Sequence, residues 1–108
     1  MSSTILQINY KFGATSADLT TLVTPMAESI AAVPGLVWKI WLMNEAEHEA
    51  GGIYLFQSRD EAQAFVTSPG VQEFAAHPML SNVSVKMFEP VESLSKITRA
   101  PLEVPVTA

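Results

Sequence analysis

The stretch LVWKIWLM, residues 36–43, is apolar at every position except Lys39. Its length is typical of a β-strand, in which alternate side chains point to opposite faces of the sheet. The two predicted faces are Leu36, Trp38, Ile40 and Leu42 on one side and Val37, Lys39, Trp41 and Met43 on the other. A strand that is apolar on both faces must be covered on both, and a single layer of helices covers only one of them. The stretch therefore predicts that a second layer of protein covers the remaining face.

Three further strands are predicted around this one. A polar turn at residues 44–49 leads into GGIYLF, residues 51–56, which predicts the partner strand of a hairpin. The glycine pair at its start indicates either a bulge or a close approach of two backbones. Upstream, residues 5–12 alternate apolar and polar side chains, and downstream residues 83–88 do the same. Both patterns are typical of strands with one buried face.

Two helical regions separate these strands. Thr15, with Asp18 three residues later, is typical of a helix start, and apolar residues follow at three- and four-residue spacing as far as Ile30. Pro25 lies inside that stripe and predicts a kink or a break. A second helix is predicted to begin after Ser58, with Glu61 completing a capping box, and one or two further helical turns are expected at residues 71–76.

The predicted element order is β-α-β-β-α-β, which is the order of ferredoxin-like α+β domains with a four-stranded antiparallel sheet. Right-handed crossovers place both helices on one face of that sheet. The uncovered face then predicts that two copies pack sheet to sheet as a dimeric α/β barrel. We expect a single domain over residues 1–108, in which residues 89–108 form an irregular tail, with one helical turn near 91–94, that frays or crosses to the partner subunit.

Composition narrows the classes of function. The chain carries a net charge of −5, and its six lysine and arginine residues are scattered, which argues against nucleic acid as a partner. Because cysteine is absent, disulfides and thiolate chemistry are excluded. Nothing resembles a secretion signal, and no apolar run is long enough to span a membrane, so a cytoplasmic protein without membrane contact is expected.

Three aromatic residues are the first candidates for a binding site. Trp38 and Trp41 lie three residues apart in one strand, so they must face opposite sides of the sheet, and Tyr54 lies on the partner strand. Each of them is suited to packing in a core or a dimer interface. Together they are also suited to lining a slot for a flat ligand, oriented by the Tyr54 hydroxyl or the Trp38 indole N–H. Asn9, on the more polar face of the first strand, either contacts solvent or binds a substrate oxygen.

The two histidines are the candidate proton carriers. His48 precedes Glu49, which favours either an acid–base pair or a solvated turn residue. His77, before Pro78, is suited to capping the second helical region or to facing a cavity between helix and sheet. No metal site is predicted, since three converging ligands are not evident, and no glycine loop of nucleotide-binding spacing is present.

Three segments resemble a known family: PMAESI at residues 25–30, PGLVWKIW at 34–41 and, above all, HEAGGIYLF at 48–56. They are similar to the YdhR-type monooxygenases of the dimeric α/β-barrel superfamily, over roughly residues 5–100. The resemblance implies the fold and the homodimer predicted above. The positions that follow the family pattern are Lys39, Trp41, His48, Glu49, Gly51, Gly52 and Tyr54.

The resemblance also implies a chemistry. Related oxygenases use no cofactor, because an electron-rich aromatic, phenolic or quinol-type substrate itself reduces molecular oxygen. By resemblance, Trp38, Trp41 and Tyr54 line a pocket between sheet and helices, and His48 or His77 moves the proton. Two alternatives stay open. Polyketide cyclases of the superfamily carry a motif similar to His77-Pro78, and a non-catalytic module would bind a small hydrophobic ligand.

Overall fold

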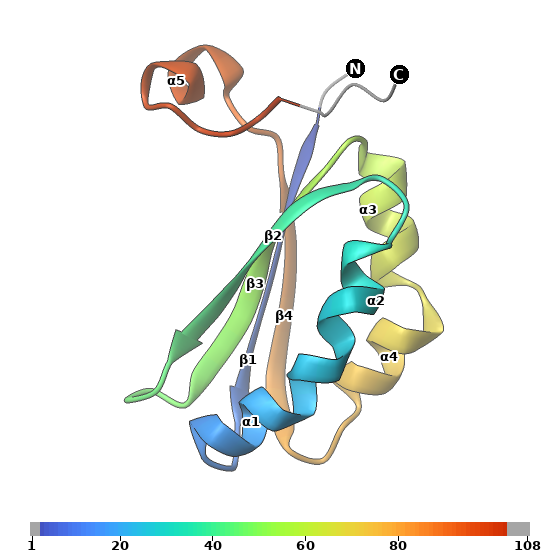
Figure 1. Ribbon diagram of the computed structural model, residues 1–108, viewed down its shortest axis with the longest axis vertical. Helices are drawn as coiled ribbons and strands as arrows, with labels where there is room; N and C mark the ends of the chain where they lie inside the picture. Colours follow the sequence, from blue (N-terminus) through green and yellow to red (C-terminus); the bar gives the residue numbers. More distant parts are fainter. Residues whose placement is uncertain (1–2, 104–108) are drawn as a thin grey trace.

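The computed structural model describes residues 3–103. A four-stranded antiparallel sheet carries four α-helices and a 3₁₀ turn on one face, and a fifth α-helix lies on the opposite side at one end (Figure 1). The strands are β1 (Thr4–Phe12), β2 (Leu36–Asn44), β3 (Glu49–Phe56) and β4 (Leu80–Phe88). Their order in the sheet is β2-β3-β1-β4. This is the predicted ferredoxin-like α+β fold.

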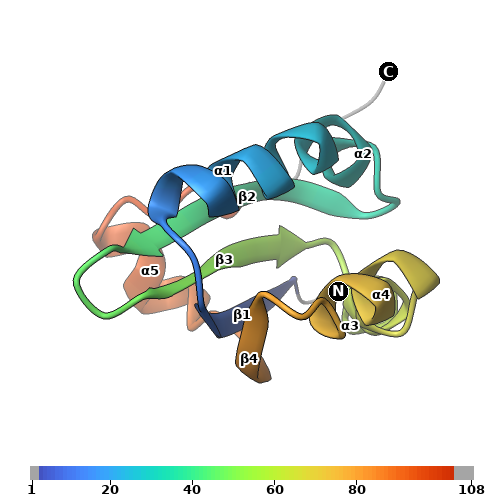
Figure 2. The same ribbon diagram turned by 90° about the horizontal axis from the view of Figure 1, so that it is seen from below.

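The helical layer has two parts, seen from below in Figure 2, with α1 and α2 near β2 and with α3 and α4 beyond β1. Its helices are α1 (Ser16–Val23), the 3₁₀ turn η1 (Thr24–Met26), α2 (Ala27–Ala31), α3 (Arg59–Val66) and α4 (Pro69–Ala75). Pro25 falls within η1, so the predicted break is confirmed. The proline has no N–H to continue the α-helical ladder, and the chain tightens into a 3₁₀ turn there.

Side chains cap both predicted helix starts. Thr15 Oγ1 accepts a hydrogen bond from the Asp18 N–H at 3.1 Å. Ser58 Oγ accepts from the Glu61 N–H at 3.2 Å, and its hydroxyl donates to Glu61 Oε1 at 3.0 Å. Each cap satisfies a backbone donor that the first turn leaves without a partner, and such caps contribute about 1 kcal/mol apiece.

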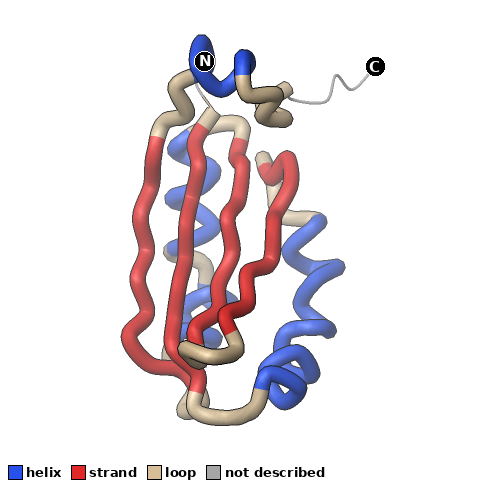
Figure 3. The backbone as a smooth tube through the Cα atoms, turned by 90° about the vertical axis from the view of Figure 1, so that its left-hand side faces the viewer, coloured by secondary structure: helices blue, strands red, loops and turns tan. Residues whose placement is uncertain are grey.

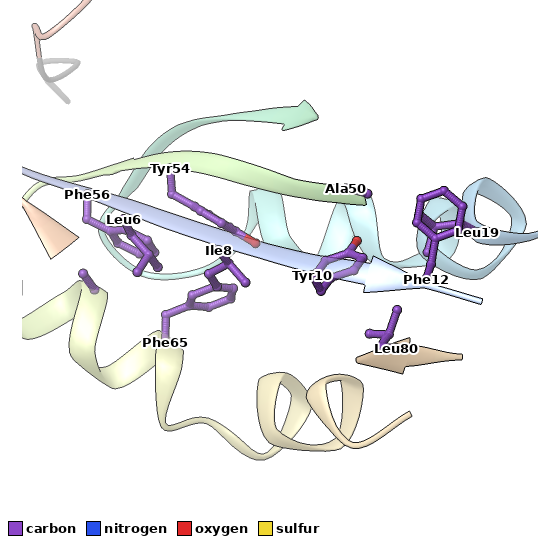
Figure 4. Packing of buried hydrophobic residues seen from close by; sticks show 11 residues of the cluster. Leu6, Ile8, Tyr10, Phe12, Leu19, Ala50, Tyr54, Phe56, Phe65 and Leu80 are labelled. Atoms are coloured by element: carbon purple, nitrogen blue, oxygen red, sulfur yellow. The ribbon is translucent and has the colours of Figure 1, made fainter. Parts of the chain in front are cut away.

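The hydrophobic core lies between the sheet and these helices (Figure 4). One alternate set of β1 side chains points into it, and Leu6 is fully buried there while Tyr10 is nearly so. Across the neighbouring strand Tyr54 packs against Phe65 of α3, with ring centroids 5.2 Å apart. The alternation read from residues 5–12 is therefore confirmed, and the core is a layer built on one face of the sheet.

The start of β2 differs from the prediction. Leu36 pairs with Phe56 and Trp38 with Leu55, so the extra residue between them is a β-bulge. Because of it, Leu36 packs against the core on the helical side while Trp38 faces away. The prediction that Leu36 and Trp38 share a face is wrong, since strict alternation fails at a bulge.

The Gly51-Gly52 pair marks a close approach of backbones. Pairing with β1 runs through both glycines without a register shift, so of the two alternatives the bulge is excluded. A Cβ atom on Gly51 would collide with the Ile8 carbonyl oxygen. The hairpin turn before it is tied to β1 as well, because the Phe12 N–H donates to the His48 carbonyl at 2.9 Å.

The face of the sheet away from the core is largely open, as the view in Figure 3 shows. Its apolar side chains include Ile40, 50% exposed, and Phe88, 48% exposed. Helix α5 (Glu92–Ile97) lies at the upper end of this face. It replaces the single turn predicted at 91–94, and the Trp38 indole N–H donates to the Pro101 carbonyl at 2.8 Å.

The rest of the predicted tail, 104–108, lies outside the described residues. Within 3–103, no helix has the length and apolar character needed to cross a bilayer.

Candidate functional site

A cavity of about 810 Å³ lies between the sheet and the helical layer. All four strands and both parts of the helical layer contribute to its wall, which is mostly apolar. The volume is within the range of pockets that hold drug-sized ligands. Among the polar side chains on this wall, we take four as the candidate site: Tyr10, Lys39, Tyr54 and His77.

Lys39 extends from β2 onto the helical side of the sheet. Its Nζ lies 3.2 Å from the centroid of the Trp41 ring and 4.6 Å from that of Tyr54. Burial lowers the pKa of Lys39 to about 7, although the face of an aromatic ring favours the charged form. Near neutral pH this amine is therefore divided between its neutral and charged forms.

The pKa values of the Tyr54 and Tyr10 hydroxyls are raised, whereas that of the Lys39 amine is lowered. Burial, reinforced by the neighbouring Tyr10, raises the pKa of Tyr54. Burial also raises the pKa of Tyr10. Both side chains come from adjacent strands and lie on the helical side of the sheet (Figure 4). They are thus neutral hydrogen-bond donors to anything bound in the cavity, and they do not act as bases at neutral pH.

His77 lies in the turn between α4 and β4 and lines the cavity. Its Nδ1 accepts a hydrogen bond from the Met79 backbone N–H at 3.1 Å. The neutral imidazole therefore carries its proton on Nε2. Of the two alternatives for this residue, the position at the cavity wall agrees with the structure.

Trp38 and Asn9 do not lie at this cavity. Trp38 pairs with Leu55 in the sheet while Trp41 pairs with Gly52, three residues away on both strands, so the two tryptophans face opposite sides as predicted. Trp41 is the one on the cavity side, and Trp38 binds Pro101 on the other. Asn9 alternates with the cavity residues Ile8 and Tyr10 and thus also points away.

His48 does not line the cavity, although Gly51, three residues further along the chain, does. It is exposed in the turn between β2 and β3, with a left-handed backbone (φ 51°). Its ring lies 5.3 Å from that of Phe12, and neither its ring nor Glu49 is part of the cavity wall. The expectation that His48 moves a substrate proton does not agree with this position, because sequence proximity to Glu49 brings neither group to the site.

Lys39 and Tyr10 are the residues that sequence reasoning missed as site residues. The sequence marks Lys39 as the exception in an apolar strand and as a position of the family pattern, but gives it no role in a site. Its spacing of two from Trp41 was the available signal, since it places an amine and an indole on one face. Trp41 itself is 40% exposed and also lines a second cavity of about 310 Å³ beside α1.

No set of three or more side chains of the metal-binding types converges within residues 3–103. The cavity therefore offers hydrogen-bond donors, an imidazole and an amine, set in an apolar and aromatic wall.

Solved structures of low sequence identity share the fold. SnoaB of Streptomyces nogalater, described as a cofactor-independent oxygenase, is 17% identical with a TM-score of 0.68, over 84% of this chain and 95% of SnoaB. The haem degrader MhuD of Mycobacterium tuberculosis, solved with two haems in its active site, is 22% identical with a TM-score of 0.62, over 81% and 95%. A Deinococcus radiodurans protein described as a "putative antibiotic biosynthesis monooxygenase" is 13% identical with a TM-score of 0.67, over 81% and 91%.

The family comparison is more specific than these structural likenesses. None of the curated proteins compared with the sequence matches it significantly. The family described as "Putative mono-oxygenase ydhR" matches residues 5–101, which include the hairpin, both helical regions and every cavity residue named above. The chain belongs to the ydhR mono-oxygenase family.

Proposed function

We propose that this protein is a cofactor-independent monooxygenase that oxidises a small aromatic, phenolic or quinol-type compound in the cavity between sheet and helices. The observation that carries the proposal is the combination of an apolar cavity of about 810 Å³ with the amine of Lys39 and the hydroxyl of Tyr54 on neighbouring strands. Family membership supports the reaction class.

In this reaction the substrate supplies all the electrons. A ring CH₂ flanked by hydroxylated rings becomes a carbonyl, one atom of O₂ enters the product, and the other leaves as water with the two hydrogens. The protein must favour the electron-rich anion of the substrate and keep bulk water away from it. The apolar wall provides the second condition, and the tyrosine hydroxyls donate hydrogen bonds to the developing oxyanion.

His77 is the proposed proton carrier on the helical side of the site. Because the Met79 N–H holds its Nδ1, the ring is oriented and Nε2 is left as the exchanging atom. Trp41 is proposed to stack on the substrate, since it is partly exposed and lines the cavity.

Oxygen uptake tests the proposal. Metal-free and flavin-free protein is mixed with a panel of anthrones and hydroquinones in ¹⁸O₂, with a chelator present. The expected result is enzyme-dependent oxygen consumption that survives chelation, with one labelled oxygen in the product. Absence of consumption with every substrate would contradict the proposal, and melting shifts without turnover would indicate a binding module instead.

A polyketide cyclase is the second candidate, favoured by the position at the cavity wall of His77, the residue before Pro78. Cyclisation needs a proton carrier beside an enolisable chain and consumes no oxygen. A ring-closed product formed under anaerobic conditions, and lost in His77→Asn, would select this function over oxygenation.

We also propose that the working unit is a homodimer formed through the open face of the sheet. Ile40 and Phe88 are about half exposed on this face, and α5 adds the exposed Leu94 and Ile97 beside it. Apolar side chains gathered on one face are typical of an interface. A second copy presents the same face, which a two-fold axis makes self-complementary.

A further inference from the structure

The side chain of Lys39 occupies a groove that the opposite strand leaves free for it. Lys39 pairs with Tyr54 in the sheet, and the next residue of β3 on the same face is Gly52. A Cβ atom at Gly52 would come within 2.5 Å of Lys39 Cε, so the lysine stem lies across the bare glycine backbone. The absence of a side chain at position 52 is thus what lets the amine reach the rings of Trp41 and Tyr54.

The charge of this amine is not neutralised by the protein. Burial is the cause that lowers the pKa of Lys39, and within the described residues no carboxylate offsets it. The other titratable side chains lining the cavity are Tyr10 from β1, Tyr54 from β3, Glu61 from α3, Glu73 from α4 and His77 from the α4–β4 turn, while α1, η1 and α2 contribute none. Glu61 is bound to Ser58 in the helix cap.

A partly buried amine in an aromatic setting has a specific chemical preference. As the neutral amine it accepts a proton from a bound hydroxyl: the ligand O–H bond breaks, an Nζ–H bond forms, and an ammonium–oxyanion pair results. In that pair the ligand oxyanion supplies the negative charge that the protein does not place beside the ammonium. A ligand that stays neutral, or one that is a cation, brings no negative charge to the ammonium.

We propose that Lys39 selects the substrate, so that the cavity takes aromatic compounds with an acidic phenolic or enolic hydroxyl and holds them as the anion paired with the Lys39 ammonium. This inference rests on the proposed function, whose substrate class it narrows. It assigns Lys39 as a binding residue in contact with the ligand oxygen, with the face of Trp41 holding the other side of the ammonium.

The test measures ionisation of a bound probe and does not require turnover. 4-Nitrophenol is used because its anion absorbs visible light and its neutral form does not, and 4-nitroanisole is the matched ether that cannot ionise. In the native protein the ionisation midpoint of bound 4-nitrophenol is expected to fall by about one pH unit or more relative to the free probe, equivalent to a tenfold preference for the anion. No binding, or an unshifted midpoint, would overturn the proposal.

Two variants assign the effect to the residue. Lys39→Met is expected to bind 4-nitroanisole as the native protein does, which shows an intact cavity, and to lose the shift of the 4-nitrophenol midpoint. Lys86→Met removes an exposed lysine on the other face of the sheet and is expected to change neither. A shift that persists in Lys39→Met would overturn the proposal. If the native protein shifts the 4-nitrophenol midpoint and Lys39→Met does not, but no oxygen uptake is found with any substrate, the role of Lys39 stands and the monooxygenase proposal fails.

Discussion

The amine nitrogen of Lys39 lies 3.2 Å from the centroid of the Trp41 ring, two residues further along the same strand. Side chains at this spacing point to the same face, so the strand itself brings the cation and the indole together. The contact lies in the cavity wall, and the pKa of Lys39 has been lowered to about 7 there.

Lys39→Met is therefore expected to stabilise the fold at and below neutral pH. In the unfolded chain the amine keeps its ordinary pKa near 10.5, whereas in the fold it releases its proton near pH 7. Between these values unfolding takes up a proton, so native stability rises with pH by up to about 1.4 kcal/mol per unit. Below pH 7 the amine is protonated in both states, so the folded protein bears the full free-energy cost of burying the Lys39 charge.

Urea denaturation of both proteins between pH 6 and 9.5, values set below tyrosine ionisation (about pH 10), checks this. The advantage of Lys39→Met should be greatest at the acidic end and should shrink as pH rises. A constant difference across the range would show that Lys39 is not a titrating buried group.

The adjacent glycines offer a matched pair of substitutions. Gly51→Ala places a Cβ against the Ile8 carbonyl, a backbone atom that cannot move aside, and should cost about 3 kcal/mol or more. Gly52→Ala meets the flexible end of Lys39 first, so we expect a loss of about 1 kcal/mol. The displaced amine should also lose its effect on bound 4-nitrophenol. Equal destabilisation by the two substitutions would contradict this assignment.

Substitution of His77 should lower turnover much more than substitution of His48. His77→Asn keeps an acceptor for the Met79 N–H but removes the imidazole, and is expected to lower oxygen uptake about tenfold or more. His48→Asn retains a residue that tolerates the left-handed backbone of the turn, and uptake should stay within about twofold of native. A large loss in His48→Asn, with unchanged melting, would return that residue to the site.

The dimer is tested on the open face of the sheet. Ile40→Glu places a charge where the second copy is proposed to pack, and sedimentation velocity should show monomers at concentrations where the native protein is dimeric. Gln63→Glu, on an exposed position of α3, is the control and should leave the dimer intact. A stable native monomer at micromolar concentration would refute the proposed interface.

Most of the fold was accessible from the sequence because each element carried its own periodicity. The strand at residues 5–12, the caps at Thr15 and Ser58 and the break at Pro25 depend on local spacing, and the structure confirms them. The bulge before Trp38 was missed because it is a property of the pairing between two strands. Helix α5 was underestimated because six residues have little helical preference of their own, and packing decides whether they form a helix.

The site was only partly predictable for a related reason. Alternation showed that Trp38 and Trp41 must face opposite sides, but which of them faces the helices depends on how β2 pairs with β3. No site role was predicted for Lys39, although it follows the family pattern, because a lysine in a strand is ordinarily solvated. Its role became visible only with the bare backbone of Gly52 beneath its stem. His48 is the opposite case: its position beside Glu49 in the sequence suggested a site residue, but it lines neither of the two cavities described above.

Trp41 lines the cavity of about 810 Å³ and also the cavity of about 310 Å³ beside α1, and Tyr10, Val23 and Gly51 line both with it, so the two cavities share one wall. The Lys39 amine lies over the Trp41 ring, which is part of this shared wall. The amine that is proposed to bind the substrate anion therefore lies against a wall that the two cavities share, so a ligand that moves this amine acts on both of them.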